Sequence, residues 1–409
     1  MKNDTQAKHK VTERILQLAD HWHSRLVEIR REFHMYPELS NQEFRTTSRI
    51  NEMLQEFSIE KIETNLTTGT AAILHGKQDG PVIAIRADID ALPIQEENEW
   101  KFKSKHEGIS HACGHDFHTA IAIGAALILR DLQDEFPGKQ LPGSVKFFFQ
   151  PAEETEGGAE SMIHAGLLQN PSVNAIIGLH NKPEIPAGTI GIKEGFLMGS
   201  VDDFRICIKG KGGHAALPEK TIDPIVIGSA VVQLLQTIVS RAVSPLESAV
   251  VTVGQFHAGH ATNVIPNEAV IAGTVRTSSP AIQNRIENLL TQSVRQTVEA
   301  MGGKAEIEYA RLYPPVVNDA KVAAVLKQSA VKIVGATHTL EAEPTMGGED
   351  FSFFQLEVPG CYYWLGTGNP EKGVIHGWHH PEFKVDEEAI KTGSAMMAQS
   401  VLDLMDKLK

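Results

Sequence analysis

The chain has 409 residues, which is more than one compact unit usually holds, so we expect two domains. Hydrophobic residues make up 42% of the sequence, enough to bury a substantial core, and this excludes a disordered chain. The 51 acidic residues outnumber the 38 basic ones and give a net charge of −13. That charge argues against nucleic acid or an anionic membrane as the main partner.

Cysteine content and hydropathy bear on the compartment. Three cysteines are too few for a disulfide framework and fit a reducing cytosol. The N-terminus is charged throughout and lacks the apolar core of a signal peptide. No apolar run reaches the roughly 20 residues needed to span a bilayer. We therefore expect a soluble, cytoplasmic protein with no membrane partner.

The first half of the chain alternates between helix and strand patterns. Apolar residues at steps of three and four predict a helix over 11–35, which Pro37 ends. Ser40 followed by Glu43 matches a capping box and predicts the start of a second helix. Another helix is expected over 118–132, and four apolar segments are expected as strands: TAAILHG, PVIAIRADID, VKFFFQ and NAIIGLH. This alternation predicts an α/β fold with a mostly parallel sheet covered by helices.

A different pattern begins near residue 199. Strands and helices follow in the order β-α-β-β-α-β, which is the ferredoxin-like arrangement. The α/β pattern then resumes, and Asp386 is expected to cap the last helix. We predict one α/β domain, formed by residues 1–198 and 312–409, interrupted by an inserted domain at 199–311.

Metal-ligating residue types occur at or just after predicted strand ends, where open α/β sheets place their sites, at the start of a predicted helix (His115) and in the downstream segment HGWHHPEF. Their positions are Asp88, Asp90, His115, Glu153, Glu154, His180, His376, His379 and His380. A single such residue is usually only a hydrogen-bonding group. The adjacent carboxylates of Glu153 and Glu154 are more telling, because they would repel each other beside a buried strand unless a cation were near. The set as a whole predicts a metal site.

The segment HACGHDFHTA (111–120) adds a cysteine to three histidines. It is not a zinc finger, since no Cys-x-x-Cys pair occurs elsewhere. The segment GKGGH (210–214) lacks the ending of a phosphate-binding loop, and no Gly-x-Ser-x-Gly nucleophile motif occurs. These absences argue against nucleotide binding and against a serine hydrolase.

Eight segments occur in an order that resembles the aminoacylase/carboxypeptidase-type metallo-amidohydrolases. They are RADIDALPI, HACGHDFHTA, QPAEETEGGA, GLHNKP, GKGGHAALP, ATNVIPNEAVIAGTVRT, GGEDFSFF and HHPEF. The branch resembles hippurate hydrolases, N-acyl-amino-acid amidohydrolases and plant auxin-conjugate hydrolases. The resemblance extends from about residue 25 to about residue 405, and it is specific for the family but not for the substrate.

The resemblance implies two divalent metal ions per subunit. It assigns the ligands Cys113, His115, Glu154, His180 and His379, with His380 as the alternative to His379. Glu153 matches the general base and Asp90 the supporting aspartate, while Asp88 stands where other branches have a histidine. Manganese or zinc is expected, and cobalt or nickel would also suit these ligands.

The resemblance also implies that the inserted domain is a lid and a dimerisation domain. It assigns substrate-binding roles to His214, Asn263, Arg276, Gly347 and Gly348. Arg276 would pair with a substrate carboxylate, and His214 would donate to the developing oxyanion. In relatives this histidine reaches into the partner's site, so we expect a homodimer with shared active sites.

The expected activity is hydrolysis of the amide bond of a small N-acyl amino acid by a metal-activated water. One alternative keeps the site and cleaves short peptides, as a dipeptidase or carboxypeptidase. An alternative of another class is a catalytically silent metal-binding or scaffold protein.

Overall fold

The computed structural model describes residues 2–155 and 157–408 and divides into two compact units. The main unit comprises Met1–Gly195, Asn318–Glu343 and Phe353–Lys409, and the insert comprises Phe196–Val317 and Pro344–Ser352. The insert includes the short segment 344–352 because this segment bonds to the beginning of the insert. There the amide of Gly199 donates to the carbonyl of Gly347 at 2.9 Å.

The main unit is built on an eight-stranded sheet with the order β1-β2-β4-β3-β5-β16-β6-β15. Its central strands β4, β3, β5 and β16 run parallel, whereas β1, β2 and β6 are attached to neighbours antiparallel. The strands are β1 (Glu60–Ile62), β2 (Thr70–Leu74), β3 (Val82–Asp88), β4 (Ser144–Gln150), β5 (Ala175–Pro186), β6 (Ile190–Ile192), β15 (Thr339–Glu341) and β16 (Gly360–Gly368). The predicted mostly parallel α/β sheet is confirmed.

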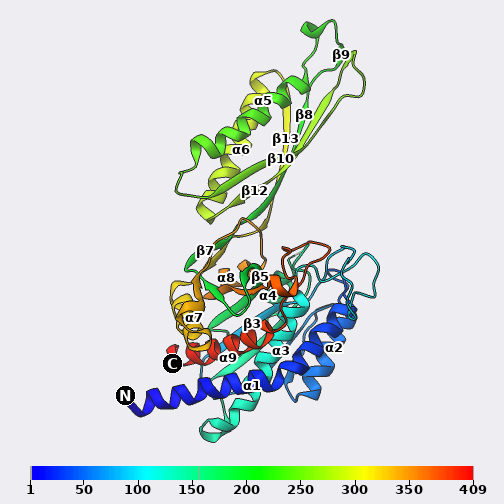
Figure 1. Cartoon of the computed structure of the whole chain (residues 1–409). Helices are drawn as coiled ribbons and strands as arrows, with labels where there is room; N and C mark the ends of the chain where they lie inside the picture. The colour runs from blue at the N-terminus through cyan, green and yellow to red at the C-terminus, as the bar shows by residue number, and fades with distance from the viewer. Residues whose placement is uncertain (1, 156, 409) are drawn as a thin grey trace. The chain divides into compact units, whose positions relative to one another are not determined.

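Helices cover this sheet (Figure 1). They are α1 (Lys2–Met35), α2 (Phe44–Glu56), α3 (His115–Leu132), α4 (Gly158–His164), α7 (Ala320–Val334), α8 (Phe351–Glu357) and α9 (Ala389–Lys407). Helix α3 is almost wholly buried, because it packs between α1 and α9 and against the sheet. Burial of β3 and β4 along their full length explains why most of their residues are apolar.

Two predicted helix caps are wrong. Helix α2 begins at Phe44, and no side-chain cap forms at Glu43. Instead, Glu38 accepts from the amides of Arg45 at 3.0 Å and Thr46 at 2.7 Å, while Ser40 and Glu43 turn away from the helix. Helix α9 begins at Ala389, so Asp386 accepts from the Glu388 amide at 3.2 Å in the turn before it. A sequence pattern for a cap does not reveal that a tertiary contact competes for the same side chains.

The insert has the predicted ferredoxin-like fold, with the strand order β10-β12-β8-β13 and antiparallel neighbours throughout. Its sheet strands are β8 (Val201–Lys209), β10 (Ala249–Ala258), β12 (Glu268–Thr277) and β13 (Lys304–Tyr313), and its helices are α5 (Pro224–Thr237) and α6 (Pro280–Ala300). The short pairs are β9 (Gly213–His214) with β11 (Val264–Ile265), and β7 (Gly195–Met198) with β14 (Val316–Asn318). Burial alternates along β8, since only one face of the sheet is covered by the helices.

One helix of the insert is unusually apolar. The stretch Pro224–Ala242 is long and apolar enough, by length and composition alone, to cross a membrane. Its side chains Ile227, Val231 and Leu235 pack into the core of the insert. Only 28% of the apolar window is buried within the chain, so much of this helix faces outward.

Candidate metal centre

The turn before α3 brings Cys113 and His115 to the carboxyl edge of the main sheet. Gly114 has φ of 90°, and a β-carbon there would lie 2.5 Å from Nδ2 of Asn181, so this position requires glycine. His115 follows as the first residue of α3, and its Nδ1 lies 3.1 Å from Oδ1 of Asp90. That contact orients the ring and leaves Nε2 to face the other candidate ligands.

The other predicted ligands come from distant segments. The sulfur of Cys113 lies 3.3 Å from Nε2 of His180, which lies in the buried part of β5. Oε1 of Glu154 lies 3.8 Å from Nε2 of His115 and 3.5 Å from Nε2 of His379. Three overlapping groups have ligand atoms within 4.8 Å of one another: Cys113–His115–His180, Cys113–Glu154–His379 and His115–Glu153–Glu154. The structure thus gathers the five proposed ligands and Glu153 in one place.

The donor atoms fit a metal ion. Nε2 of His115 and Oε1 of Glu154 are buried and have no hydrogen-bond partner among the described residues. Unsatisfied buried polar atoms are costly, so two of them facing each other indicate a ligand that satisfies both. A thiolate, imidazoles and a carboxylate are the ligand types of zinc and related divalent ions.

The electrostatics of the cluster also favour a cation. Burial and the carboxylates of Glu154 and Glu153 raise the pKa of the Cys113 thiol well above its usual value. Burial lowers the pKa of His115, but Asp88 and Asp90 outweigh it and raise that pKa to about 10. Neighbouring carboxylates contribute to both shifts, and a bound divalent cation would neutralise that negative charge.

Asp88 and His118 form a buried network behind the ligands. Asp88 accepts from Nδ1 of His118 at 2.7 Å and from the Arg86 guanidinium at 2.6 Å. Nε2 of His118 accepts from the backbone amide of Asn181 at 3.0 Å. Both ring nitrogens of His118 are thus engaged by Asp88 and Asn181, although its ring also lies in a group with Asp88 and His115 whose ligand-type atoms are within 4.8 Å of one another. Sequence reasoning missed Arg86 and Asn181, although a cation inside a fully buried strand was a signal for Arg86.

The remaining histidines of the segments HACGHDFHTA and HGWHHPEF, namely His111, His376 and His380, have other contacts. His380 stacks on His376 with ring centroids 4.0 Å apart, and its Nδ1 accepts from the amide of Glu382 at 3.0 Å. This geometry places His379, and not His380, beside Glu154. His111 is buried near His34, with ring centroids 6.4 Å apart, and burial lowers its pKa to about 4.

The insert holds the predicted substrate-binding residues. His214 is exposed on β9, and the amide of Ala215 donates to the carbonyl of Asn263 at 3.1 Å. Arg276 is half-buried near the end of β12, where its guanidinium contacts Thr274. The amide of Gly347 donates to Oγ1 of Thr345 at 3.3 Å, and a β-carbon on Gly348 would lie 2.1 Å from Val201. Gly348 therefore meets a packing requirement in addition to its proposed role.

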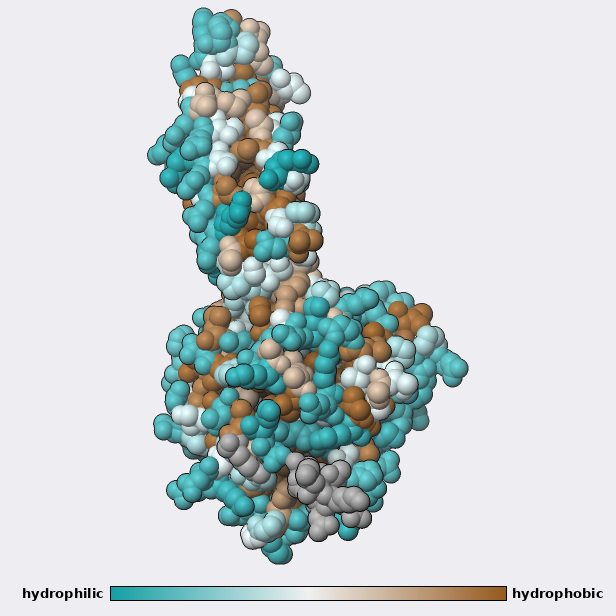
Figure 2. Space-filling view, turned by 90° about the vertical axis from the view of Figure 1, so that its left-hand side faces the viewer, coloured by the Kyte–Doolittle hydropathy of each residue, from teal (hydrophilic) through white to brown (hydrophobic). Residues whose placement is uncertain are grey.

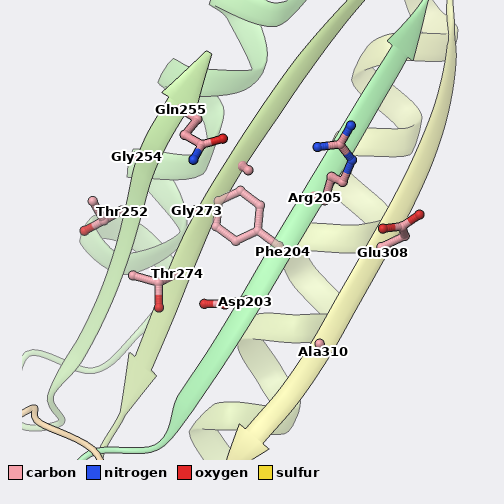
Figure 3. Close-up of a pocket in the computed structure, with 11 residues that line it drawn as sticks. Asp203, Phe204, Arg205, Thr252, Gly254, Gln255, Gly273, Thr274, Glu308 and Ala310 are labelled. Atoms are coloured by element: carbon pink, nitrogen blue, oxygen red, sulfur yellow. The ribbon is translucent and has the colours of Figure 1, made fainter. Parts of the chain in front are cut away.

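A hollow of about 520 Å³ lies on the helix-free face of the insert sheet (Figure 3). Arg205 and Glu308 stand on neighbouring strands beside it, and none of its described lining residues is a histidine or a cysteine. The hollow lacks the ligand types gathered at the main sheet, so the metal centre and not this hollow is the candidate catalytic site.

Comparison with known proteins identifies the family. The model of peptidase family M20/M25/M40 matches residues 84–403. The chain belongs to this family. The N-acetylcysteine deacetylase of Bacillus subtilis (strain 168) is 43% identical to it over 389 residues, covering 95% of this chain and 99% of the relative. The IAA-amino acid hydrolase ILR1-like 4 of Arabidopsis thaliana is 38% identical over 390 residues, covering 94% and 86%.

A solved structure agrees. The Bacillus subtilis YXEP protein, described as a dinuclear metal binding peptidase from the M20 family, superposes with a TM-score of 0.83 at 40% identity. The match covers 95% of this chain and 99% of that one. The resemblance seen in the sequence is confirmed, and the chain is an M20-type amidohydrolase enzyme with a metal-binding site.

Proposed function

We propose that this protein is a cytoplasmic, metal-dependent amidohydrolase that cleaves an N-acyl amino acid into a carboxylate and a free amino acid. The observation that carries the proposal is the convergence of Cys113, His115, Glu154, His180 and His379 beside Glu153. Each ligand type is present, and one carboxylate of the Glu pair remains as a base. The names of the deacetylase and hydrolase relatives support the same substrate class.

The five ligands would hold two divalent ions, as in the dinuclear relative. Manganese or zinc suits a set of thiolate, imidazole and carboxylate, and cobalt or nickel is also compatible. Such ions supply two effects when bound: they lower the pKa of a water molecule and polarise the substrate carbonyl. Asp90 holds Nδ1 of His115 and so fixes the ring for binding through Nε2.

Glu153 is the proposed general base. It is 7% exposed, and its carboxylate lies close to the carboxylate of Glu154 and the ring of His115, with ligand-type atoms of the three within 4.8 Å of one another. A carboxylate there takes a proton from the attacking water at one oxygen and returns it to the leaving nitrogen. In the insert, Arg276 would pair with the α-carboxylate of the substrate through two parallel hydrogen bonds. His214 and Asn263, with backbone amides at 347–348, would contact the acyl carbonyl.

The insert also supports a homodimer. Helix α5 exposes Ile225 and Val226, the latter by 56%, although the helix is strongly apolar. The neighbouring sheet edge is formed by β10, which exposes Val250 and Phe256. Figure 2 shows hydrophobic residues in brown along this side of the insert. Exposed apolar residues and an unpaired strand edge together favour association with a second copy of the chain.

The experiment that tests the proposed function is a hydrolysis panel. Apo-enzyme refilled with zinc, manganese, cobalt or nickel is given N-acetyl and N-benzoyl amino acids and, in parallel, dipeptides with free amino termini. We expect metal-dependent release of amino acid from the acylated substrates. Preferential cleavage of dipeptides would favour the peptidase alternative, which the family name also admits. Absence of turnover with every metal would favour a silent metal-binding protein.

Cys113 is expected to act as a ligand and not as a nucleophile. It is buried, and its sulfur lies 3.3 Å from Nε2 of His180, another proposed ligand. Iodoacetamide should modify Cys113 more slowly in the zinc-loaded protein than in the chelator-treated protein, because the metal occupies the sulfur. Mass spectrometry of the labelled peptide gives the rate at this residue, with half-exposed Cys207 as the internal control. Equal rates at Cys113 with and without zinc would contradict the assignment.

A further inference from the structure

The segment before α2 contacts the turn that carries the Glu pair. Residues Ser40 and Glu43 were expected to cap α2, but the carboxylate of Glu38 takes that role. Glu43 is completely buried, and its Oε1 accepts from the backbone amide of Ala152 at 2.8 Å. This amide immediately precedes Glu153 in the chain, so the bond fixes the backbone on one side of the proposed base.

The turn itself has a backbone that needs such support. Ala152 has φ of 52°, in the left-handed region that residues with a side chain rarely adopt. Its carbonyl accepts from the amide of Gly158 at 3.1 Å, and a β-carbon on Gly158 would lie 1.8 Å from the carbonyl oxygen of Pro151. A strained turn persists only where the surrounding structure holds it, and strain of this kind is common at functional sites.

A second contact holds the other side of the pair. The amide of Glu154 donates to Oδ2 of Asp90 at 3.1 Å, and the hydroxyl of Ser40 donates to the same oxygen at 2.7 Å. Asp90 also orients His115 through its other oxygen. Ser40 therefore acts on Glu154 and on His115 through one carboxylate. Glu43 thus holds Ala152 directly, and Ser40 holds Glu154 through Asp90, so the residues before and after Glu153 are both fixed.

We infer that Glu43 and Ser40 are positioning residues, which hold the Glu153–Glu154 turn in the geometry that general-base chemistry requires. The inference rests on the proposed function of Glu153. Neither side chain has to touch the substrate for this role. Burial raises the pKa of Glu43, as does the nearby charge of Asp90, so a neutral side chain of the same shape should be tolerated there.

The test compares Glu43→Ala, Glu43→Gln and Ser40→Ala at saturating zinc. Because misplacing a catalytic group by about 1 Å can cost roughly 10²-fold in rate, we expect Glu43→Ala to lower kcat by about 10–100-fold. Its KM and its zinc content should change little. Glu43→Gln should restore kcat to within about threefold of wild type, because the amide oxygen can still accept from Ala152. Ser40→Ala should lower kcat by a smaller factor of roughly 3–10.

The matched control is Glu38→Ala, which removes the actual cap of α2 without touching the 152–154 turn. It should lower the melting temperature while kcat stays near wild type. If Glu43→Ala and Ser40→Ala both kept the kcat of this control, the positioning role would be overturned. If Glu43→Ala fails to fold, Ser40→Ala and Glu43→Gln decide the question. A large loss of kcat in Glu43→Gln would then contradict the inference that a hydrogen-bond acceptor of this size at position 43 is sufficient. Glu153→Gln is assayed alongside, and an active Glu153→Gln would refute the proposed base itself and not only its support.

Discussion

Replacing Glu153 with glutamine is expected to lower kcat by roughly 10²–10⁴-fold or more while the bound metal stays nearly complete. The amide keeps the size of the carboxylate but cannot accept a proton at its nitrogen or act as a base at its oxygen. Its neighbour Glu154 faces His115 and His379, so the ligand atoms are untouched by this change. Steady-state kinetics and atomic-absorption analysis of metal content measure the two quantities separately.

The adjacent residue provides the matched control. Glu154→Gln replaces a proposed ligand with a weaker one, so this variant should lose metal affinity in addition to activity. The two variants carry the same substitution, Glu to Gln, at adjacent positions of the chain. If Glu153→Gln lost its metal and Glu154→Gln kept it, the assignment within the pair would be reversed. If Glu153→Gln kept wild-type turnover, the proposed mechanism would be wrong.

Replacing His214 with alanine is expected to lower kcat by roughly 10²–10³-fold without loss of metal. The amide of Ala216 donates to Nδ1 of His214 at 3.1 Å, so the neutral ring carries its proton on Nε2. The exposed Nε2–H is then a donor for a developing oxyanion. Removing one such donor costs about 2.7–4 kcal/mol in the transition state, which corresponds to the stated loss of rate.

The position of His214 within the insert argues that it serves a second subunit. Strand β9, which carries His214, pairs with β11, which directly follows Asn263, and lies beyond the Glu268 end of β12 (Figure 1). Arg276 lies at the opposite, Thr277 end of β12. A ten-residue strand separates these ends by roughly 30 Å. One N-acyl amino acid cannot reach both residues of the same insert. If both contact one substrate, as we propose, they belong to different copies of the chain.

Mixing two inactive variants tests this shared site. Mixed dimers of His214→Ala with Glu153→Gln would contain one site in which both residues are intact, so activity should reappear after subunit exchange. Each variant alone, taken through the same exchange procedure, gives the baseline activity. Efficient exchange with no recovered activity would refute the shared site. Near-normal turnover by His214→Ala alone would also remove the proposed oxyanion role.

The sequence by itself determined the family, the mostly parallel sheet of the main unit, the ferredoxin-like sheet of the insert, and which residues are candidate metal ligands and base. Segments rich in apolar residues indicated that β3 and β4 are strands buried on both faces, and alternation indicated that β8 is a strand with one solvent-facing side. These patterns are local consequences of which faces are buried, so they can be read without coordinates. The ordered motifs carried the family resemblance and, through it, the candidate ligands.

Only the tertiary structure decided between residues that look alike in sequence. Adjacent His379 and His380 differ because a backbone amide engages His380 while His379 faces Glu154. His118, equal in type to His115, is occupied on both nitrogens by Asp88 and Asn181.

The same holds for Ser40 and Glu43, which match a helix cap but bond across the fold to Asp90 and Ala152. Such a side chain can form a hydrogen bond with a local or a distant partner, and the folded chain adopts the choice that leaves the fewest buried polar groups unpaired. The distant partners come within reach only after segments far apart in sequence have packed together, so the sequence alone does not reveal the choice.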